Sequence, residues 1–284
     1  MHPMTDIHLV HVFPAGPGGG NPAPIVVDAD GMSDAEMQAV AGKYGHESGF
    51  VLAGPPGFDL ALRFWVPEHE MSMCGHATVG AVWVLRRLGR VTGDQLRIST
   101  ASGEVRARLR DGIEISQPVG TVEPVSEVEA VLDVLGITAA DLAPYPVQNA
   151  STARVKTLVP LASTDILDGL QPDFSRVKEV CDLVGSTGLY PYAMRDRQVF
   201  EARQFPRSSG YPEDAATGIA AAALAFGLLE NGLVERGDRP IRVRQGRAMG
   251  RPSEITLRLD GSRGLWLGGH VQVESAAGSA PPVR

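Results

Sequence analysis

Short apolar segments separated by turn residues run through the whole chain and predict many short strands. HLVHVF (His8–Phe13) and APIVVD (Ala23–Asp28) fit strands on either side of a turn rich in glycine and proline. The segment APYPVQNAS (143–151) looks like a linker. Further strands are predicted at LRIST, GEVRARLR and GIEIS, and later in the chain at VKTLVPL, TGLYPYAM, VFEARQF, PIRVRQG and SEITLRLD.

Four segments have helical signals between these strands. Ser33 and Glu36 form a capping box, in which each side chain can accept a hydrogen bond from a free backbone N–H, and we expect this helix to stop between Gly42 and Gly45. AVWVLRRLG (81–89) and SEVEAVLDVLG (126–136) predict further helices. The helix expected from Thr217 to Asn231 consists almost entirely of small and apolar residues, so it must be buried.

Composition limits the possible functions. The 284 residues are 43% hydrophobic and 21% charged, which allows one large domain or two small ones with a sizeable core. The net charge of −7 argues against nucleic acid or an anionic membrane surface as a partner. We find no run of 18 apolar residues and no signal-peptide pattern, and two cysteines make no disulfide framework, so a cytoplasmic protein is expected. The tail SAAGSAPPVR is expected to be disordered.

Two segments half a chain apart are similar. RFWVPEHEMSMCGHATVGA and RQFPRSSGYPEDAATGIA both run from a strand through a proline-containing loop into Ala-Thr and a helix, and Ala77-Thr78 matches Ala216-Thr217. Two copies of one unit would place both helix starts at one cleft, where free N–H groups and the positive dipole end suit a carboxylate. Alternatively, both are ordinary strand-to-helix turns of an alanine-rich protein.

Five segments together resemble the PhzF family of isomerases. They are GNPAPIVVD, HESGFVL, CGHATVGA, GYPEDAATG and RQGRAMGRPSEI, in the order and with the spacing of that family's motifs. The resemblance implies an α+β, diaminopimelate-epimerase-like fold, with two pseudo-symmetric domains that each wrap a barrel-like, mostly antiparallel sheet around a central helix. The implied domains are residues 1–120 plus about 264–275, and 121–263. A homodimer without metal or organic cofactor is also implied.

The resemblance further implies which residues act. Glu47 matches the catalytic glutamate, which would move a proton between two carbons of a small unsaturated acid and so shift a C=C double bond. His76 and Asp214 match residues that orient the substrate or assist the transfer. The expected contacts to the substrate's carboxylate come from the neighbourhood of the two helix starts, namely Cys74, Gly75, Thr78, Thr217, Gly218, Ile219 and, beside the glutamate, His46.

The chain departs from the family pattern near these residues. His46 and Tyr44 stand where the family has polar residues before the glutamate, and Ile219 replaces a serine. These changes disfavour the phenazine precursor as substrate and favour a different, less polar unsaturated acid, in a specialised pathway such as antibiotic biosynthesis.

Two alternatives stay open. The first is an epimerase, racemase or dehydratase that acts on an amino acid such as proline, with Cys74 paired to a group other than a thiol. The second is a binding protein that kept the fold without the chemistry. A metal site at Cys74 and His76 would need more ligands at characteristic spacings than we find.

Overall fold

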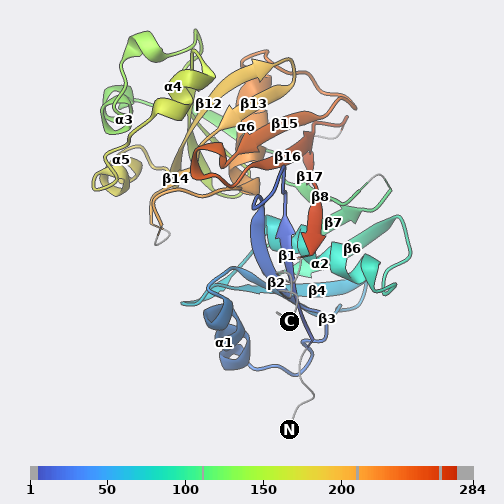
Figure 1. The fold of residues 1–284 in the computed structure, drawn as a ribbon. Coiled ribbons are helices and arrows are strands. Elements are labelled where there is room, and N and C mark those ends of the chain that lie inside the picture. The colour runs from blue at the N-terminus through green and yellow to red at the C-terminus, as the bar shows by residue number, and fades with distance from the viewer. Residues whose placement is uncertain (1–5, 111, 209–210, 262–263, 274–284) are drawn as a thin grey trace, which may run out of the picture.

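Mixed β-sheet with few helices makes up the protein, in a computed structural model that describes residues 6–110, 112–208, 211–261 and 264–273. The first half and the second half of the chain form two lobes stacked along the long axis of the molecule (Figure 1). The helices are α1 (Asp34–Tyr44), α2 (Gly75–Arg87), α3 (Val128–Leu135), α4 (Thr164–Gly169), α5 (Val177–Leu183) and α6 (Gly218–Glu230), with 3₁₀ turns at Ala139–Asp141 and Arg247–Met249.

Strands β1 to β9 belong to the first part of the chain. They are β1 (Ile7–Val12), β2 (Asn21–Val26), β3 (Ser48–Ala53), β4 (Leu60–Trp65), β5 (Glu70–Met71), β6 (Gln95–Thr100), β7 (Gly103–Arg108), β8 (Glu114–Gln117) and β9 (Thr121–Pro124). The others are β10 (Gln148–Ser151), β11 (Val155–Leu161), β12 (Gly188–Asp196), β13 (Val199–Ala202), β14 (Phe205–Pro206), β15 (Ile241–Gln245), β16 (Ser253–Arg258), β17 (Leu265–Gly268) and β18 (Val271–Val273).

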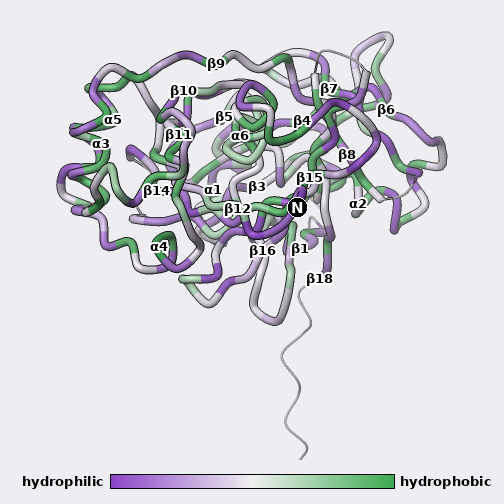
Figure 2. The backbone as a smooth tube through the Cα atoms, turned by 90° about the horizontal axis from the view of Figure 1, so that it is seen from above, coloured by the Kyte–Doolittle hydropathy of each residue, from purple (hydrophilic) through white to green (hydrophobic). Residues whose placement is uncertain are grey.

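Each half wraps its sheet around one buried helix. In the first half, α2 packs against β1, β2, β3 and β8, and Gly80 permits this close approach because a Cβ there would lie 3.1 Å from Val10 Cγ2. In the second half, α6 packs against β9, β10, β11 and β16 and is buried on almost every side, as its small residues predict. Seen from above, α6 lies near the centre of the molecule, whereas α3, α4 and α5 form one edge (Figure 2).

The end of the chain joins the two halves. Strand β17 pairs with β16 of the second half and with β8 of the first, and β18 then pairs with β1. We propose residue 121 as the boundary between the halves, because β9 starts there and pairs with β10. Most pairings are antiparallel, and the parallel ones are β2–β3, β4–β6, β11–β12 and β13–β15. The architecture is α+β with the diaminopimelate-epimerase-like arrangement.

Some local predictions are confirmed and others are wrong. The capping box of Ser33 and Glu36 is present, and Gly45 ends α1 in the left-handed conformation at φ 68°. The linker prediction for 143–151 is wrong, because Gln148–Ser151 forms β10 between β9 and β11. The polar residues of this segment are typical of a loop. It forms a strand because β9 and β11 pair with its two edges.

The short helices α4 and α5, which the sequence did not suggest, pack with α3 in a separate apolar cluster over β11 and β12. The tail segment SAAGSAPPVR lies outside the described residues. Within the described chain, none of the helices has the length and apolar character that a membrane crossing requires.

Candidate active site

The starts of α2 and α6 face one small cleft between the two halves. Its free volume is about 100 Å³, which suits a small molecule. The first N–H groups of each helix have no partner within the helix, and neither cap residue, Cys74 or Thr217, makes a side-chain capping bond. The lining residues are Asn21, Glu47, Met71, Met73, Cys74, Gly75, His76, Arg154, Lys156, Thr187, Gln204, Pro206, Tyr211, Asp214, Ala216, Thr217, Gly218 and Ile219.

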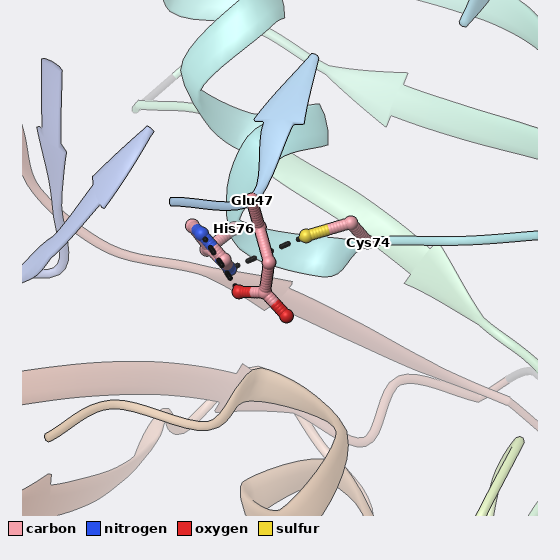
Figure 3. Close-up of side chains that lie close together, drawn as sticks. All are labelled: Glu47, Cys74 and His76. Atoms are coloured by element: carbon pink, nitrogen blue, oxygen red, sulfur yellow. Dashed lines mark hydrogen bonds and ion pairs between the residues drawn. The ribbon is translucent and has the colours of Figure 1, made fainter. Parts of the chain in front are cut away.

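Glu47 reaches this cleft from the turn between α1 and β3. The left-handed Gly45 ends the helix, and the Ser48 hydroxyl donates a 3.1 Å hydrogen bond to the His46 carbonyl, which fixes the turn. The carboxylate points away from its own strand toward the chain of the second half (Figure 3). Its side chain is 28% exposed. Burial raises the pKa of Glu47, and the nearby Arg154 guanidinium opposes the rise. A carboxyl group in this setting can both accept and return a proton.

His76, in the first turn of α2, is joined through its two ring nitrogens to both Glu47 and Cys74 (Figure 3). Its Nε2 is 3.4 Å from Glu47 Oε2, and its Nδ1 is 3.4 Å from Cys74 Sγ. Burial lowers the pKa of His76 to about 4, although the Asp214 charge opposes this shift, so the ring is neutral near pH 7. Burial, together with the Glu47 charge, raises the pKa of the Cys74 thiol well above its usual range. Cys74 is therefore a neutral thiol rather than a nucleophilic thiolate.

Asp214 is held just ahead of α6. The Thr217 hydroxyl donates to Asp214 Oδ2, and the Ala216 N–H lies 3.5 Å from Oδ1. Gln245 fastens the same turn, because its Nε2 donates to the Asp214 carbonyl at 2.6 Å and its Oε1 accepts from the Thr217 N–H at 3.3 Å. Burial raises the pKa of Asp214 to about 6, the Thr217 hydrogen bond opposes the rise, and the Glu47 charge adds to it.

Most of the residues predicted at the site line the cleft. Gly75, Gly218 and Ile219 do so at the helix starts. Thr78 and His46 are not among the lining residues: Thr78 is fully buried inside α2 and donates to the Cys74 carbonyl at 2.7 Å. Thr78 is therefore used inside the protein, because its buried hydroxyl bonds to the backbone of its own helix instead of facing the cleft.

The structure aligns the two halves differently from the sequence. Gly75 begins α2 and Gly218 begins α6, so the cap residues Cys74 and Thr217 correspond, at an offset of 143 residues. The alignment of Ala77-Thr78 with Ala216-Thr217 that the sequence suggested is wrong. Ala77-Thr78 lies inside α2, whereas Ala216-Thr217 precedes α6. The counterpart of the Cys74 thiol is therefore the Thr217 hydroxyl. The second cysteine, Cys181, lies in the separate apolar cluster around α3 and α5.

The sequence profile of the family described as "Phenazine biosynthesis-like protein", PhzC-PhzF, matches residues 10–277. The chain belongs to this family. An "Uncharacterized isomerase" of Deinococcus radiodurans is 32% identical over 96% of this chain and 94% of that protein. The "Trans-2,3-dihydro-3-hydroxyanthranilate isomerase" of Pseudomonas fluorescens is 29% identical over 91% of both.

Solved structures agree with the PhzC-PhzF assignment. The PhzF-family protein of Bacillus anthracis superposes with a TM-score of 0.82 at 26% identity, and the match covers 95% of this chain and 96% of that one. A hydroxyproline epimerase from Agrobacterium vitis has a TM-score of 0.58 at 13% identity, with 95% and 93% covered. This similarity shows a common fold, and an identity of 13% supports no statement about a common reaction.

Sequence reasoning missed several residues of this PhzC-PhzF cleft. Arg154, Lys156 and Thr187 come from the start of β11 and from the residue before β12, and Gln204 comes from the link between β13 and β14. Arg154, Lys156 and Thr187 belong to no motif in the sequence, whereas Gln204 lies in the second of the two similar segments, where its role was not recognised. Asn21 lay within the quoted GNPAP segment, and its Nδ2 donates to the Ala216 carbonyl at 3.1 Å, which ties the two halves together at the cleft.

One set of side chains could hold a metal ion. The ligand atoms of Glu47, Cys74 and His76 lie within 4.8 Å of one another, and this is the one group of that kind in the described part of the chain. Independence of metals therefore stays a prediction.

Proposed function

We propose that this protein is a PhzF-type isomerase that shifts a C=C double bond in a small unsaturated carboxylic acid by moving one proton. The observation that carries the proposal is the Glu47 carboxyl group, which faces the cleft between the two helix starts with His76 Nε2 3.4 Å from its Oε2. The names of the relatives support the reaction class, since both curated proteins above are called isomerases.

The reaction needs one group that takes a proton from one carbon and returns it to another. The Glu47 carboxylate removes the proton, and the electron pair of the C–H bond moves through the double bond toward the substrate's own carboxylate. The resulting carboxylic acid of Glu47 then protonates the other end of the conjugated system. No atom is gained or lost. The raised pKa of Glu47 suits both steps, because a base with a pKa nearer neutrality also returns the proton readily.

The two helix starts would stabilise the negative charge that builds up during this transfer. The free N–H groups near Gly75, His76, Gly218 and Ile219 can donate to the substrate carboxylate from both sides. A neutral His76 can donate a hydrogen bond without forming a permanent ion pair with Glu47. Asp214 and its bonded Thr217 would orient the polar end of the substrate.

A thiol epimerase is the less favoured candidate. The cleft contains one cysteine of the two in the sequence, its pKa is raised, and its counterpart in the other half is Thr217. The predicted homodimer, the cytoplasmic location and a role in antibiotic or other specialised metabolism remain part of the proposal; light scattering of the purified protein measures the first of these.

Deuterium uptake from heavy water tests the proposal directly. Candidate dienoic and enoic acids are incubated with the protein in D2O, and incorporation at carbon is followed by NMR and mass spectrometry. We expect exchange with the wild type and a loss of at least about 10³-fold in Glu47→Gln, since removal of a general base has effects of this order. The control is Glu68→Gln, an exposed carboxylate of the adjoining loop, which should exchange normally. Full exchange by Glu47→Gln, or none by the wild type with any acid, would refute the proposal.

A further inference from the structure

The part of the cleft that the second half lines contains two polar side chains that the proposed chemistry does not use. Lys156 in β11 is 6% exposed, and Gln204 between β13 and β14 is 1% exposed. Both line the cleft. The backbone fixes Gln204 there, because its carbonyl accepts the Asp214 N–H at 3.0 Å. These two residues are therefore built into the site instead of lying on the surface.

Neither side chain has a partner among the described residues. Both amide atoms of Gln204, Oε1 and Nε2, are buried without a hydrogen bond. For the Lys156 ammonium no hydrogen bond or ion pair is found among the described residues, but unlike the Gln204 amide it is not one of the fully buried atoms without a partner. A buried amide without a partner is destabilising, so the Gln204 side chain suits a place where a ligand completes its hydrogen bonds.

The absence of a side chain at Gly188 leaves room for the side chains of Lys156 and Gln204. A Cβ on Gly188 would lie 2.2 Å from Gln204 Nε2 and 3.2 Å from Lys156 Nζ. The two donors thus approach the same point of the backbone and lie side by side. An ammonium beside an amide NH₂ provides donors for anionic oxygens.

A simpler explanation is that Lys156 only balances the charges of Glu47 and Asp214. That explanation is incomplete: the Asp214 charge does act on Lys156, but neither Asp214 nor Glu47 forms an ion pair with the ammonium within the described chain. It also leaves Gln204 unexplained, since an amide has no net charge. Burial lowers the pKa of Lys156 to about 8, with the Asp214 charge opposing and the Arg154 charge assisting this shift, so the amine is mostly charged at pH 7.

We propose that Lys156 and Gln204 form a subsite for a second carboxylate of the substrate, so that the preferred substrates are small unsaturated dicarboxylic acids, in place of the less polar acid that the sequence alone favoured. The first carboxylate would bind at the helix starts and the second at this subsite, with the reacting carbons beside Glu47. The inference rests on the proposed isomerase function, which supplies the first carboxylate and the position of the reacting carbons.

The test is a binding measurement that needs no turnover. Isothermal titration calorimetry compares trans-glutaconate with trans-2-pentenoate, which has the same five carbons with a methyl group in place of the second carboxylate. We expect wild type and Glu47→Gln to bind glutaconate at least about tenfold more tightly than pentenoate, because a charge-assisted hydrogen bond in a buried site has an effect of this size. Deuterium exchange, measured separately, reports on the isomerase function alone.

Lys156→Met keeps the length of the side chain and removes the charge. It should weaken glutaconate binding at least about tenfold and change pentenoate binding less than about threefold. Lys43→Met, at an exposed position on α1, is the matched control and should change neither. If Lys156→Met keeps the full preference for glutaconate, or loses both ligands equally while folded, the subsite is wrong.

Gln204→Glu provides a second variant of nearly the same shape in case Lys156→Met does not fold. The new carboxylate repels a second anionic group, so glutaconate should lose its advantage while pentenoate keeps its affinity. Unchanged glutaconate binding would overturn the inference. Inorganic phosphate is titrated as well: if it binds in a Lys156-dependent way and glutaconate shows no preference, the subsite takes a phosphate and the carboxylate assignment is wrong.

Discussion

The starts of α2 and α6 are equivalent in the fold and differ in what surrounds them. At α2, the cap residue Cys74 and the neighbouring His76 and Glu47 form a chain of titratable groups at 3.4 Å separations. At α6, four hydrogen bonds of Gln245 hold the cap residue Thr217, the turn at Asp214 and the Tyr190 hydroxyl. The start of α2 carries a chain of titratable groups, whereas the turn before α6 is held by the hydrogen bonds of Gln245. In the proposed mechanism, the two equivalent helix starts would take different tasks in one site.

After the loss of the carboxyl group in Glu47→Gln, the largest expected effect comes from moving that group at the α2 side. Glu47→Asp shortens the side chain by one methylene and withdraws the carboxylate from His76 and from the reacting carbon. A displacement of about 1 Å can lower a rate roughly 100-fold. We expect this loss in the deuterium-exchange rate, with an unchanged circular dichroism spectrum. A rate within threefold of the wild type would mean that Glu47 does not contact the reacting atoms.

The fixed α6 side should respond in stability as well as rate. Gln245→Ala removes a side chain that is 1% exposed and leaves the Tyr190 hydroxyl and the Thr217 N–H without their partner. We expect a loss of about 2 kcal/mol in the free energy of unfolding and about tenfold in exchange rate. Gln117→Ala, at a buried glutamine of β8 outside the cleft lining, controls for the loss of buried volume. Equal rates in the two variants would show that Gln245 does not position the site.

The pH dependence of stability separates His76 from Asp214. The pKa of His76 is about 4 in the folded protein, below its value of about 6.5 in the unfolded chain, so its contribution is present above pH 6.5 and is lost as the pH falls toward 4. Asp214 acts in the opposite direction: its folded pKa of about 6 exceeds its unfolded value, so stability is lost as the pH rises through 6.

The variant His76→Asn removes the first of these titrations. Between pH 7 and pH 5 the wild type should lose about 2 kcal/mol more than this variant in urea unfolding. Parallel losses in the two proteins would mean that the imidazole is not held neutral by burial.

A smaller contrast tests the two cap residues directly. Thr217→Val removes the hydroxyl that donates to Asp214 and should slow exchange about tenfold, because the carboxylate loses a charged-group hydrogen bond. Cys74→Ala should change the rate by less than about threefold, since the thiol remains protonated in our mechanism. The reverse order, with Cys74→Ala inactive, would favour the thiol epimerase.

No effect is expected from removing metals. Dialysis against EDTA should leave the exchange rate unchanged, and metal analysis of the active protein should find less than about 0.1 equivalent of zinc. A rate that falls with EDTA and returns with zinc would assign Glu47, Cys74 and His76 as ligands, and the acid–base chain at α2 would have to be abandoned.

The sequence by itself determined the local features and the family. Ser33 and Glu36 specify a helix cap through contacts three residues apart, and the small residues after Thr217 specify a buried helix whatever surrounds it. The ordered motifs gave Glu47, His76 and Asp214 as candidates, and the structure brings all three to one cleft. Such features depend on residues close together in the chain or on short patterns that carry a fixed chemistry.

Only the tertiary structure decided the remaining features. The equivalence of Cys74 and Thr217 follows from where each helix starts. The sequence comparison, which matched Ala77-Thr78 with Ala216-Thr217, gave an alignment that differs by four residues. The strand at Gln148–Ser151 exists because β9 and β11 pair with its two edges. Lys156 and Gln204 became candidates through burial without partners, a property that arises when segments distant in the chain pack together and that no local pattern encodes.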